Sequence, residues 1–268
     1  MGSTPIDVVI CVGPHDEAII YSQVQFTRRN VVGLKDIYLI ASRNDLMVPG
    51  CTTIPESVFP FQMSDVKRIH GENPRNGWYL QQLLKLYAGF VVPAITDFYL
   101  VVDADTFFLR PTRFFRKDGK ALYNYSRERH PPYMRHMRDL LPGLKKVFPR
   151  KSGITHHMIF KRDIVRDLTR SVENAHEGKR FYEVFLGLVR LRRHSGASEY
   201  EIYFNYVFTF HREQVALRPL SWDNNTVRPP VYSQSQTVED GPAYVSCHHY
   251  KRVDNLCGEQ RSNTQHAE

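Results

Sequence analysis

The chain has 268 residues, of which 42% are hydrophobic and 12% aromatic, a composition that supports a real core and excludes a disordered chain. Its formal net charge of +8 favours an anionic partner: a nucleoside diphosphate, a polyanionic glycan, a membrane surface or a nucleic acid. The four cysteines form no Cys-x-x-Cys pair, which argues against a zinc ribbon or a thioredoxin-type site, and no apolar run approaches the ~20 residues that span a bilayer.

Strands and helices alternate in the first half of the chain. The first strand is an apolar, β-branched run that Gly13 and Pro14 end, and the clearest helix follows a chain break at residues 73–77. We expect strands at 8–12, 36–41 and 53–55 and one ending at Asp103, with helices at 15–26 and 78–92. This alternation is typical of an α/β sheet that is parallel at its N-terminal side.

The second half of the chain predicts further strands and amphipathic helices on both sides of a long connecting segment. Residues 126–150, rich in Arg, His, Pro and Tyr, predict a partly helical segment that covers or recognises substrate, or else a surface insertion. We expect strands at 121–125, 154–161 and 243–247 and helices at 162–175 and 181–191. No repeat or linker divides the chain, so we expect one α/β domain over residues 1–259, with a mixed, mostly parallel sheet flanked by helices, and a disordered tail at 260–268.

Two aspartates, Asp103 and Asp105, end the apolar run at residues 98–102. Carboxylates at the end of a buried strand are costly unless a cation meets them. Residues i and i+2 of an extended chain point to the same side, and two oxygen ligands held close suit Mg²⁺ or Mn²⁺, which takes substrate phosphates as further ligands. The pattern predicts a metal–diphosphate site at a strand end. The alternative is that the two aspartates only cap a loop or face solvent.

The last predicted strand runs into adjacent histidines and two cations. We expect either His248 or His249 to complete the metal sphere, because adjacent side chains on a strand point opposite ways. Lys251, or the arginine after it, could neutralise the departing diphosphate. Ordinary surface residues are the alternative. A second pair, His156 and His157, lacks flanking cations, so a core or acceptor-side role is expected there.

Two carboxylates, Glu199 and Glu201, lie among tyrosines and phenylalanines. Desolvation raises a carboxyl pKa, and a carboxylate is the natural general base for deprotonating a hydroxyl nucleophile, so we assign the catalytic base to Glu199 first and Glu201 second. The alternative is that Glu199 caps a helix and the rings are core. Arg75 and Gln81, at the start of the helix at 78–92, are expected to contact phosphate or sugar, since a helix N-terminus favours anions.

Three segments together resemble glycosyltransferases of the GT-A fold: residues 9–12, 76–86 and 102–106. The likeness is greatest to a group of uncharacterised sequences that includes the N-terminal glycosyltransferase domain of a large chlorovirus protein, whose pattern residues 198–206 also match. The resemblance covers residues 6–252 and implies a GT-A-like single domain. Its N-terminal half would bind a nucleoside-diphosphate sugar and its C-terminal half an acceptor.

The resemblance also implies roles for particular residues. Mn²⁺ or Mg²⁺ would be held on the donor diphosphate by the Asp-x-Asp motif, and the nucleotide would lie near the turn after the first strand. The donor contacts so implied are Val12, Gly13, Arg43 or Asp45, Asp103, Ala104 and Asp105. In an inverting enzyme Glu199 would activate the acceptor hydroxyl, whereas in a retaining enzyme it would stabilise an oxocarbenium-like state.

The sequence therefore predicts a metal-dependent glycosyltransferase that moves a sugar, expected to be UDP-linked and with inversion, to a hydroxyl of a glycan or glycoconjugate. No P-loop, G-x-G-x-x-G or G-x-S-x-G motif is present, which argues against NTPases, dinucleotide oxidoreductases and α/β-hydrolases. The alternatives are a sugar nucleotidyltransferase, although its glycine-rich basic loop is missing, and a non-enzymatic module that binds nucleic acid or polyanionic glycan through residues 127–138. We expect a cytoplasmic protein, including a virus-encoded one, or the soluble catalytic part of a truncated Golgi-type protein.

Overall fold

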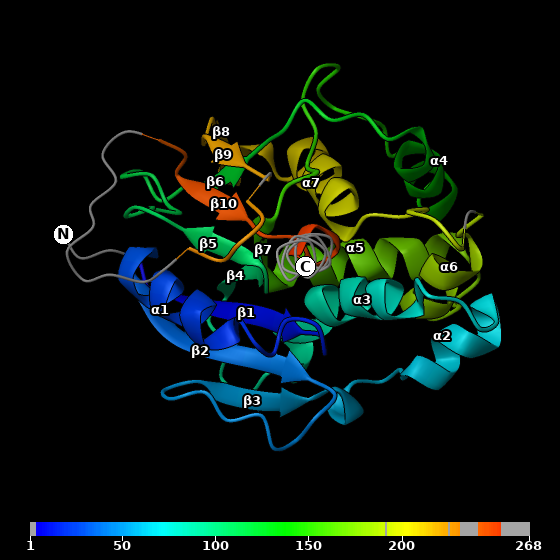
Figure 1. Ribbon diagram of the computed structural model, residues 1–268. Coiled ribbons are helices and arrows are strands. Elements are labelled where there is room, and N and C mark those ends of the chain that lie inside the picture. Colours follow the sequence, from blue (N-terminus) through cyan, green and yellow to red (C-terminus); the bar gives the residue numbers. More distant parts are fainter. Residues whose placement is uncertain (1–3, 191, 225, 231–240, 253–268) are drawn as a thin grey trace, which may run out of the picture.

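A mixed five-stranded sheet forms the centre of the protein (Figure 1). The computed structural model describes residues 4–190, 192–224, 226–230 and 241–252. The strands are β1 (Ile6–Val12), β2 (Leu34–Ala41), β3 (Thr52–Pro55), β4 (Phe98–Asp103) and β7 (His157–Lys161). Their order is β3-β2-β1-β4-β7, in which the first four run parallel and β7 is antiparallel to β4. The expected α/β class with a mostly parallel mixed sheet is therefore confirmed.

Strand β1 is buried along its whole length because it pairs with a strand on each side. The strand nevertheless contains a charged residue, Asp7, which is fully buried. The backbone amides of Thr96 and Asp36 donate to its carboxylate at 2.7 and 3.1 Å, and these bonds satisfy it. One apolar cluster joins the sheet to the helices around it, from Ile6 near one end of the chain to Tyr244 near the other.

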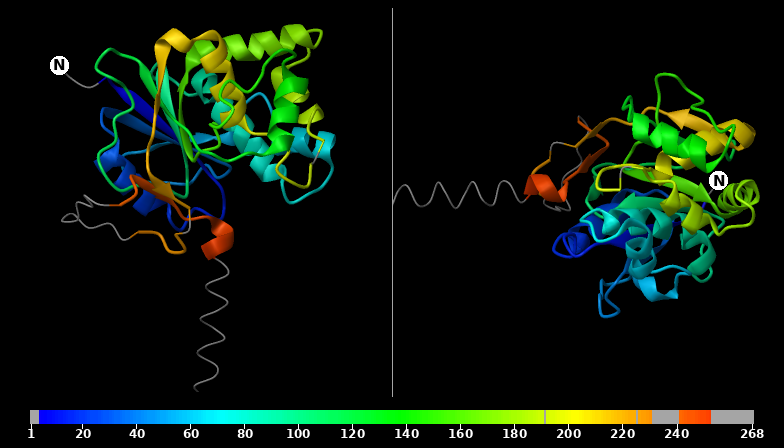
Figure 2. Two further views of the ribbon diagram at one scale, coloured as in Figure 1. Left: turned by 90° about the horizontal axis from the view of Figure 1, so that it is seen from above. Right: turned by 90° about the vertical axis from the view of Figure 1, so that its right-hand side faces the viewer.

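Helices flank this sheet and pack on one another (Figure 2). They are α1 (Ile20–Asn30), α2 (Met63–His70), α3 (Asn76–Val91), α4 (Pro131–Leu140), α5 (Arg162–Ala175), α6 (Phe181–Gly187) and α7 (Glu199–Phe210), with short 3₁₀ turns at Glu56–Val58 and Arg212–Gln214. Helices α3, α5 and α7 contact each other, and α3 also contacts β1. None of the helices in the described ranges is both long and apolar enough to cross a membrane.

Two smaller sheets complete the fold, and one of them places the last described strand beside the segment that follows Asp105. Strand β10 (Tyr244–Ser246) pairs antiparallel with β5 (Thr106–Phe108) and parallel with β9 (Trp222–Asp223). Strands β6 (Ala121–Asn124) and β8 (Val215–Arg218) form a parallel pair. In Figure 1 the orange β10 lies beside the green β5, which directly follows Asp105.

Several predicted boundaries were wrong. The helix expected from residue 15 begins only at Ile20, because residues 13–19 form turns instead. The strand expected from residue 154 begins at His157, because the Thr155 hydroxyl donates to the His157 carbonyl at 2.9 Å and favours a local turn. The helix expected to reach residue 191 ends at Gly187. The tail expected at residues 260–268 lies outside the described residues.

Candidate functional site

The Asp-x-Asp motif lies where the parallel strands β1, β2 and β4 end. Asp103 is the last residue of β4 and is paired in register with Cys11 of β1. Its backbone amide donates to the His156 carbonyl at 3.0 Å, which fixes the end of the strand against the segment before β7. Ligands of open α/β sheets bind at such carboxyl ends, so the predicted placement of the motif is confirmed as a strand end.

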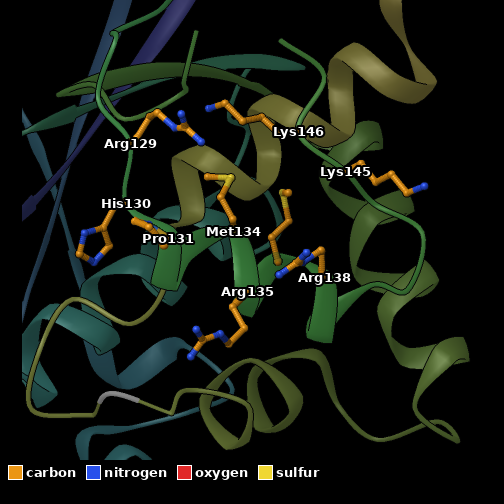
Figure 3. Close-up of a pocket in the computed structure, with 9 residues that line it drawn as sticks. Arg129, His130, Pro131, Met134, Arg135, Arg138, Lys145 and Lys146 are labelled. Atoms are coloured by element: carbon orange, nitrogen blue, oxygen red, sulfur yellow. The ribbon is translucent and has the colours of Figure 1, made fainter. Parts of the chain in front are cut away.

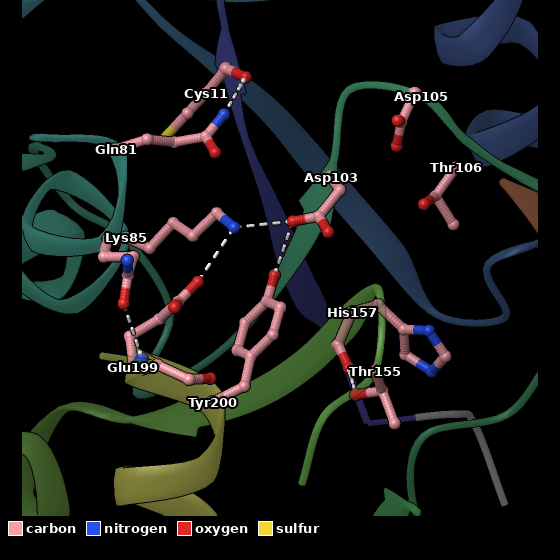
Figure 4. A network of polar contacts seen from close by, with 12 residues as sticks. Cys11, Gln81, Lys85, Asp103, Asp105, Thr106, Thr155, His157, Glu199 and Tyr200 are labelled. Atoms are coloured by element: carbon pink, nitrogen blue, oxygen red, sulfur yellow. Dashed lines mark hydrogen bonds and ion pairs between the residues drawn. The ribbon is translucent and has the colours of Figure 1, made fainter. Parts of the chain in front are cut away.

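The carboxylate of Asp103 is half satisfied (Figure 4). Its Oδ1 accepts from the Lys85 ammonium at 2.6 Å and from the Tyr200 hydroxyl at 3.0 Å. Its Oδ2 has no hydrogen-bond partner among the described residues, and the side chain is 25% exposed. One oxygen is therefore held in place while the other stays open to a ligand.

Lys85 joins the motif to helix α7. Its ammonium also donates to Oε1 of Glu199 at 2.9 Å and lies 4.6 Å above the ring of Tyr200. Burial by itself would lower the pKa of Lys85, but the carboxylates of Asp103 and Glu199 raise it well above its usual value. Lys85 is therefore a buried, charged centre that needs both carboxylates.

Glu199 begins α7 and faces Lys85. The helix is capped by Ser198, whose hydroxyl accepts from the Glu201 amide at 3.2 Å, so capping does not occupy the Glu199 carboxylate. The Glu199 amide donates to Gln82 of α3 at 3.0 Å, which fixes the two helices at this point. Burial raises the pKa of Glu199, and Lys85 opposes this shift. Lys85 thus engages Oε1, whereas Oε2 has no hydrogen-bond partner in the described part of the chain.

Asp105 is paired with the last described segment through the β5–β10 ladder. The Cys247 amide donates to the Asp105 carbonyl at 2.9 Å, and Nδ1 of His248 donates to Oδ2 of Asp105 at 2.9 Å. Burial would raise the pKa of Asp105, but His248 lowers it below the usual value. Burial would likewise lower the pKa of His248, and the bond to Asp105 raises it. The two side chains therefore form a charged pair.

These contacts leave one carboxylate oxygen open on each aspartate of the motif. Oδ2 of Asp103 and Oδ1 of Asp105 have no hydrogen-bond partners within the described ranges, and both side chains are partly exposed. Within those ranges no three His, Cys, Asp or Glu residues lie close enough together to hold an ion by themselves. A cation bound here would therefore need ligands from substrate and water, which is how Mg²⁺ usually binds at phosphate sites.

The adjacent histidines have different surroundings. His248 contacts Asp105, whereas His249 stacks on His15 with ring centroids 3.9 Å apart. Nearby, Arg252 forms an ion pair with Asp16, on the turn that follows β1. The geometry therefore favours His248 over His249 as the residue beside the motif.

His156 belongs to the site, whereas His157 belongs to the core. The His156 ring lies 5.2 Å from that of His248 and 4.8 Å from that of Trp222, and its Nδ1 is buried without a hydrogen-bond partner. Burial lowers its pKa to about 4, so its ring is neutral near the carboxylates. His157 packs edge-on against buried Phe108 and contacts no described acceptor.

The other predicted donor contacts lie around the ends of β1 and β2. Val12 and Ala104 are buried, and the Gly13 carbonyl accepts from Asp16 in the turn after β1. Gln81 donates to the Cys11 carbonyl at 3.4 Å, which places it beside that turn. Arg43, after β2, is exposed and pairs with Asp45 at 2.8 Å and with Glu17 at 3.0 Å.

Two predicted cations contact groups outside the Asp-x-Asp motif. Arg75 precedes α3, and its guanidinium lies 5.4 Å from the centre of the Trp78 ring. The Lys251 ammonium donates to the Asn224 carbonyl. Neither contact involves Asp103 or Asp105.

Glu201, the second predicted base, has a different environment from Glu199. Its side chain is 0% exposed and accepts hydrogen bonds from the Ser152 hydroxyl at 2.8 Å, the Gly153 amide and the Asn205 amide group at 3.0 Å. Lys146 also reaches it, at 3.4 Å. These contacts satisfy both oxygens, so the geometry favours a role in fixing the loop before β7 over a catalytic role.

The loop that Glu201 fixes passes very close to α7 at Gly153. A Cβ atom added there would lie 2.5 Å from the Phe204 Cβ and 2.7 Å from the Tyr200 carbonyl. We expect Gly153→Ala to lower the free energy of unfolding by about 1–3 kcal/mol through overpacking, measured by urea unfolding. Gly77→Ala is the matched control, because a Cβ there meets nothing within 4 Å, and equal stability of the two variants would contradict the close approach.

Sequence reasoning missed Lys85 and Tyr200. Lys85 stands alone among leucines in Leu83-Leu84-Lys85-Leu86, and a single charge on the buried face of an apolar helix was the available signal. Tyr200 carried no such signal, since tyrosines are common throughout that segment.

A model of the DUF6492 family, a family of unknown function, matches residues 29–252. The matched range contains Lys85, Asp103, Asp105, Glu199 and His248. No curated protein matches the chain.

Proposed function

The chain belongs to the DUF6492 family, whose function is unknown, and from the site itself we propose a metal-dependent glycosyltransferase with a GT-A-like fold. The donor is a nucleoside-diphosphate sugar, for which UDP is the first nucleotide to test. The acceptor is a hydroxyl of a glycan or glycoconjugate. The observation that carries the proposal is the pair of half-satisfied carboxylates at the end of β4, each held by a cationic side chain on one oxygen.

The charges around the motif suit a diphosphate. A divalent cation on the open oxygens of Asp103 and Asp105 would neutralise the diphosphate as it leaves. His248 orients Asp105, and Lys85 orients Asp103 through their hydrogen bonds. Lys85 thus fixes the direction of the open oxygen of Asp103, and His248 fixes that of Asp105. Electrostatic catalysis requires such preorganised groups.

Glu199 is the acceptor-side base in this proposal. Lys85 holds its Oε1, which leaves Oε2 to accept the proton of the acceptor hydroxyl as the new glycosidic bond forms. Burial raises its pKa above the usual value although Lys85 opposes the shift, and a higher pKa makes the carboxylate a stronger base. A base that deprotonates the acceptor hydroxyl fits inversion at the anomeric carbon, in which the hydroxyl attacks from the side opposite the leaving diphosphate.

The proposal is tested by titrating UDP and GDP calorimetrically in Mn²⁺ and in EDTA. We expect one nucleotide to bind only with Mn²⁺, and Asp105→Asn to weaken that binding about 10- to 100-fold, because a charged ligand of the cation is lost. Asp163→Asn, at an exposed position of α5, is the matched control and should bind as the wild type does. Binding that ignores both Mn²⁺ and Asp105→Asn would refute the donor site.

A further inference from the structure

A basic pocket lies between helix α4 and the loop that follows it (Figure 3). Its volume is about 330 Å³, within the range of about 300–1,000 Å³ that is usual for small-molecule sites. Met134 and Met137 line it, together with the basic residues Arg129, Arg135, Arg138, Lys145 and Lys146. Figure 3 shows the side chains of Arg129 and Lys146 converging above the methionines.

The positive charge of this pocket is not balanced locally. None of its lining residues, all of them in the described part of the chain, is acidic. Arg129, Arg138 and Lys145 are exposed and make no ion pair with any described residue, whereas Lys146 reaches buried Glu201 at 3.4 Å. Several like charges held together repel each other, so an anion that enters the pocket would relieve this repulsion.

The pocket is connected to the candidate active site by short contacts. Lys146 binds Glu201, which lies one residue beyond Tyr200 in α7. On the other side, His130 bonds to the Ser195 carbonyl at 2.7 Å, three residues before the Ser198 cap. Helix α4, which contributes lining residues to the pocket, also packs on α7, the helix that begins with Glu199.

Aromatic rings lie next to the pocket. Burial and, to a smaller extent, the Glu199 carboxylate raise the pKa of Tyr133 of α4, and the Tyr133 ring stacks on Trp78 of α3 with centroids 6.4 Å apart. His130 packs edge-on against Tyr133 at 4.3 Å. Both Tyr133 and Trp78 are partly exposed, so they offer ring surface to the C–H face of a bound sugar.

We propose that the pocket of Arg129, Arg138, Lys145 and Lys146 binds a carboxylate, sulfate or phosphate group of a saccharide acceptor. The anion would sit beside the two methionines, and the sugar that carries the reacting hydroxyl would extend past Tyr133 toward Glu199. Arginine forks bind such anions in a bidentate manner, which adds orientation to affinity. This inference rests on the proposed function, because it names the acceptor class of the same site.

The shape of the pocket favours an anionic saccharide over nucleic acid. Proteins that bind single strands without sequence preference use a long cationic groove with exposed rings for successive bases. Here the cations line a compact pocket together with two methionines, and His130 carries the one aromatic ring among the lining residues within the described ranges. A site of this shape holds one compact anion.

The test measures direct binding of saccharides to the full chain by calorimetry. The probes are a heparin tetrasaccharide for sulfate, a hyaluronan tetrasaccharide for carboxylate, mannose 6-phosphate for phosphate, and neutral cellotetraose. We expect at least one anionic probe to bind, cellotetraose not to bind, and Arg129→Gln/Arg138→Gln to weaken the anionic probe about 10- to 100-fold. Arg170→Gln/Lys179→Gln removes two exposed charges on and after α5 and is the matched control, expected to bind within about two-fold of the wild type.

Three results would overturn the proposal. These are equal affinity for cellotetraose and the anionic probes, anionic binding that is insensitive to the arginine substitutions, and tighter binding of a short single-stranded RNA with a steep salt dependence. Titration of UDP with Mn²⁺ on the same variants reports on the donor site separately. Loss of UDP binding in every sample alongside retained saccharide binding would refute the donor site but support the anion pocket.

Discussion

Lys85→Met is expected to lower the free energy of unfolding by about 3–5 kcal/mol, because it leaves two carboxylates in a buried site without their cation. The Lys85 side chain is 5% exposed, so water screens its contacts to Asp103 and Glu199 very little. Urea unfolding followed by circular dichroism measures the effect. The same variant is expected to lose Mn²⁺-dependent UDP binding, since Asp103 would no longer be oriented by its Oδ1 contact.

A second substitution separates the loss of the ion pairs from a general packing defect. Lys85→Met/Glu199→Gln removes one of the stranded charges, so it is expected to be more stable than Lys85→Met alone. Lys67→Met is the matched control, because Lys67 is a half-exposed helical lysine, and it should change stability by less than about 1 kcal/mol. If Lys85→Met unfolds like the control, the buried charge network does not exist in solution.

Glu199→Gln is expected to slow sugar transfer about 10²- to 10⁴-fold, the usual contribution of a general base. An amide of nearly the same shape keeps the packing at the start of α7 and the hydrogen bond to Lys85, but it cannot accept a proton. The measurement is UDP release from the donor sugar with and without acceptor. Affinity for UDP should remain, since the Glu199 carboxylate contacts Lys85 and not the open oxygens of the motif.

Glu183→Gln serves as the control for this experiment, because Glu183 is partly exposed on α6 and belongs to no part of the proposed site. It should transfer sugar at the rate of the wild type. An unchanged transfer rate in Glu199→Gln would remove the general base from the proposal. Retention of configuration in the product would point instead to a role for Glu199 in stabilising an oxocarbenium-like state.

The parts of the fold that the sequence predicts are those with strong local signals. Strand β1 is a continuous β-branched run, and helix α5 was predicted with its observed bounds because its apolar residues repeat at helical spacing. Helix α2 was missed because its capping box uses Gln62 at the N-cap, where Ser, Thr, Asp or Asn is the usual residue. Strands β8 and β9 have four and two residues, too few for a period, and they form only by pairing with β6 and β10.

The same distinction applies to the site. The placement of Asp103 at a strand end followed from the sequence, because the apolar run and the carboxylates are adjacent. The choice between Glu199 and Glu201 could not be derived, since both lie among aromatic residues. Residues two apart on a helix point in opposite directions, so the packing of α7 turns Glu199 to Lys85 and Glu201 to the loop before β7. Contacts such as Lys85–Glu199, 114 residues apart, arise only from tertiary structure.

Because β10 pairs with β5, ligand binding at the site and docking of β10 are thermodynamically linked. Three residue pairs hold β10 to β5, and the bond between His248 and Asp105 joins positions 143 residues apart. Any ligand that engages Asp105 and His248 together binds only molecules in which β10 is docked, so mass action stabilises the docked strand. Amide exchange in Tyr244–Ser246 would then slow in proportion to ligand concentration, which makes this strand a reporter of binding within the fold itself.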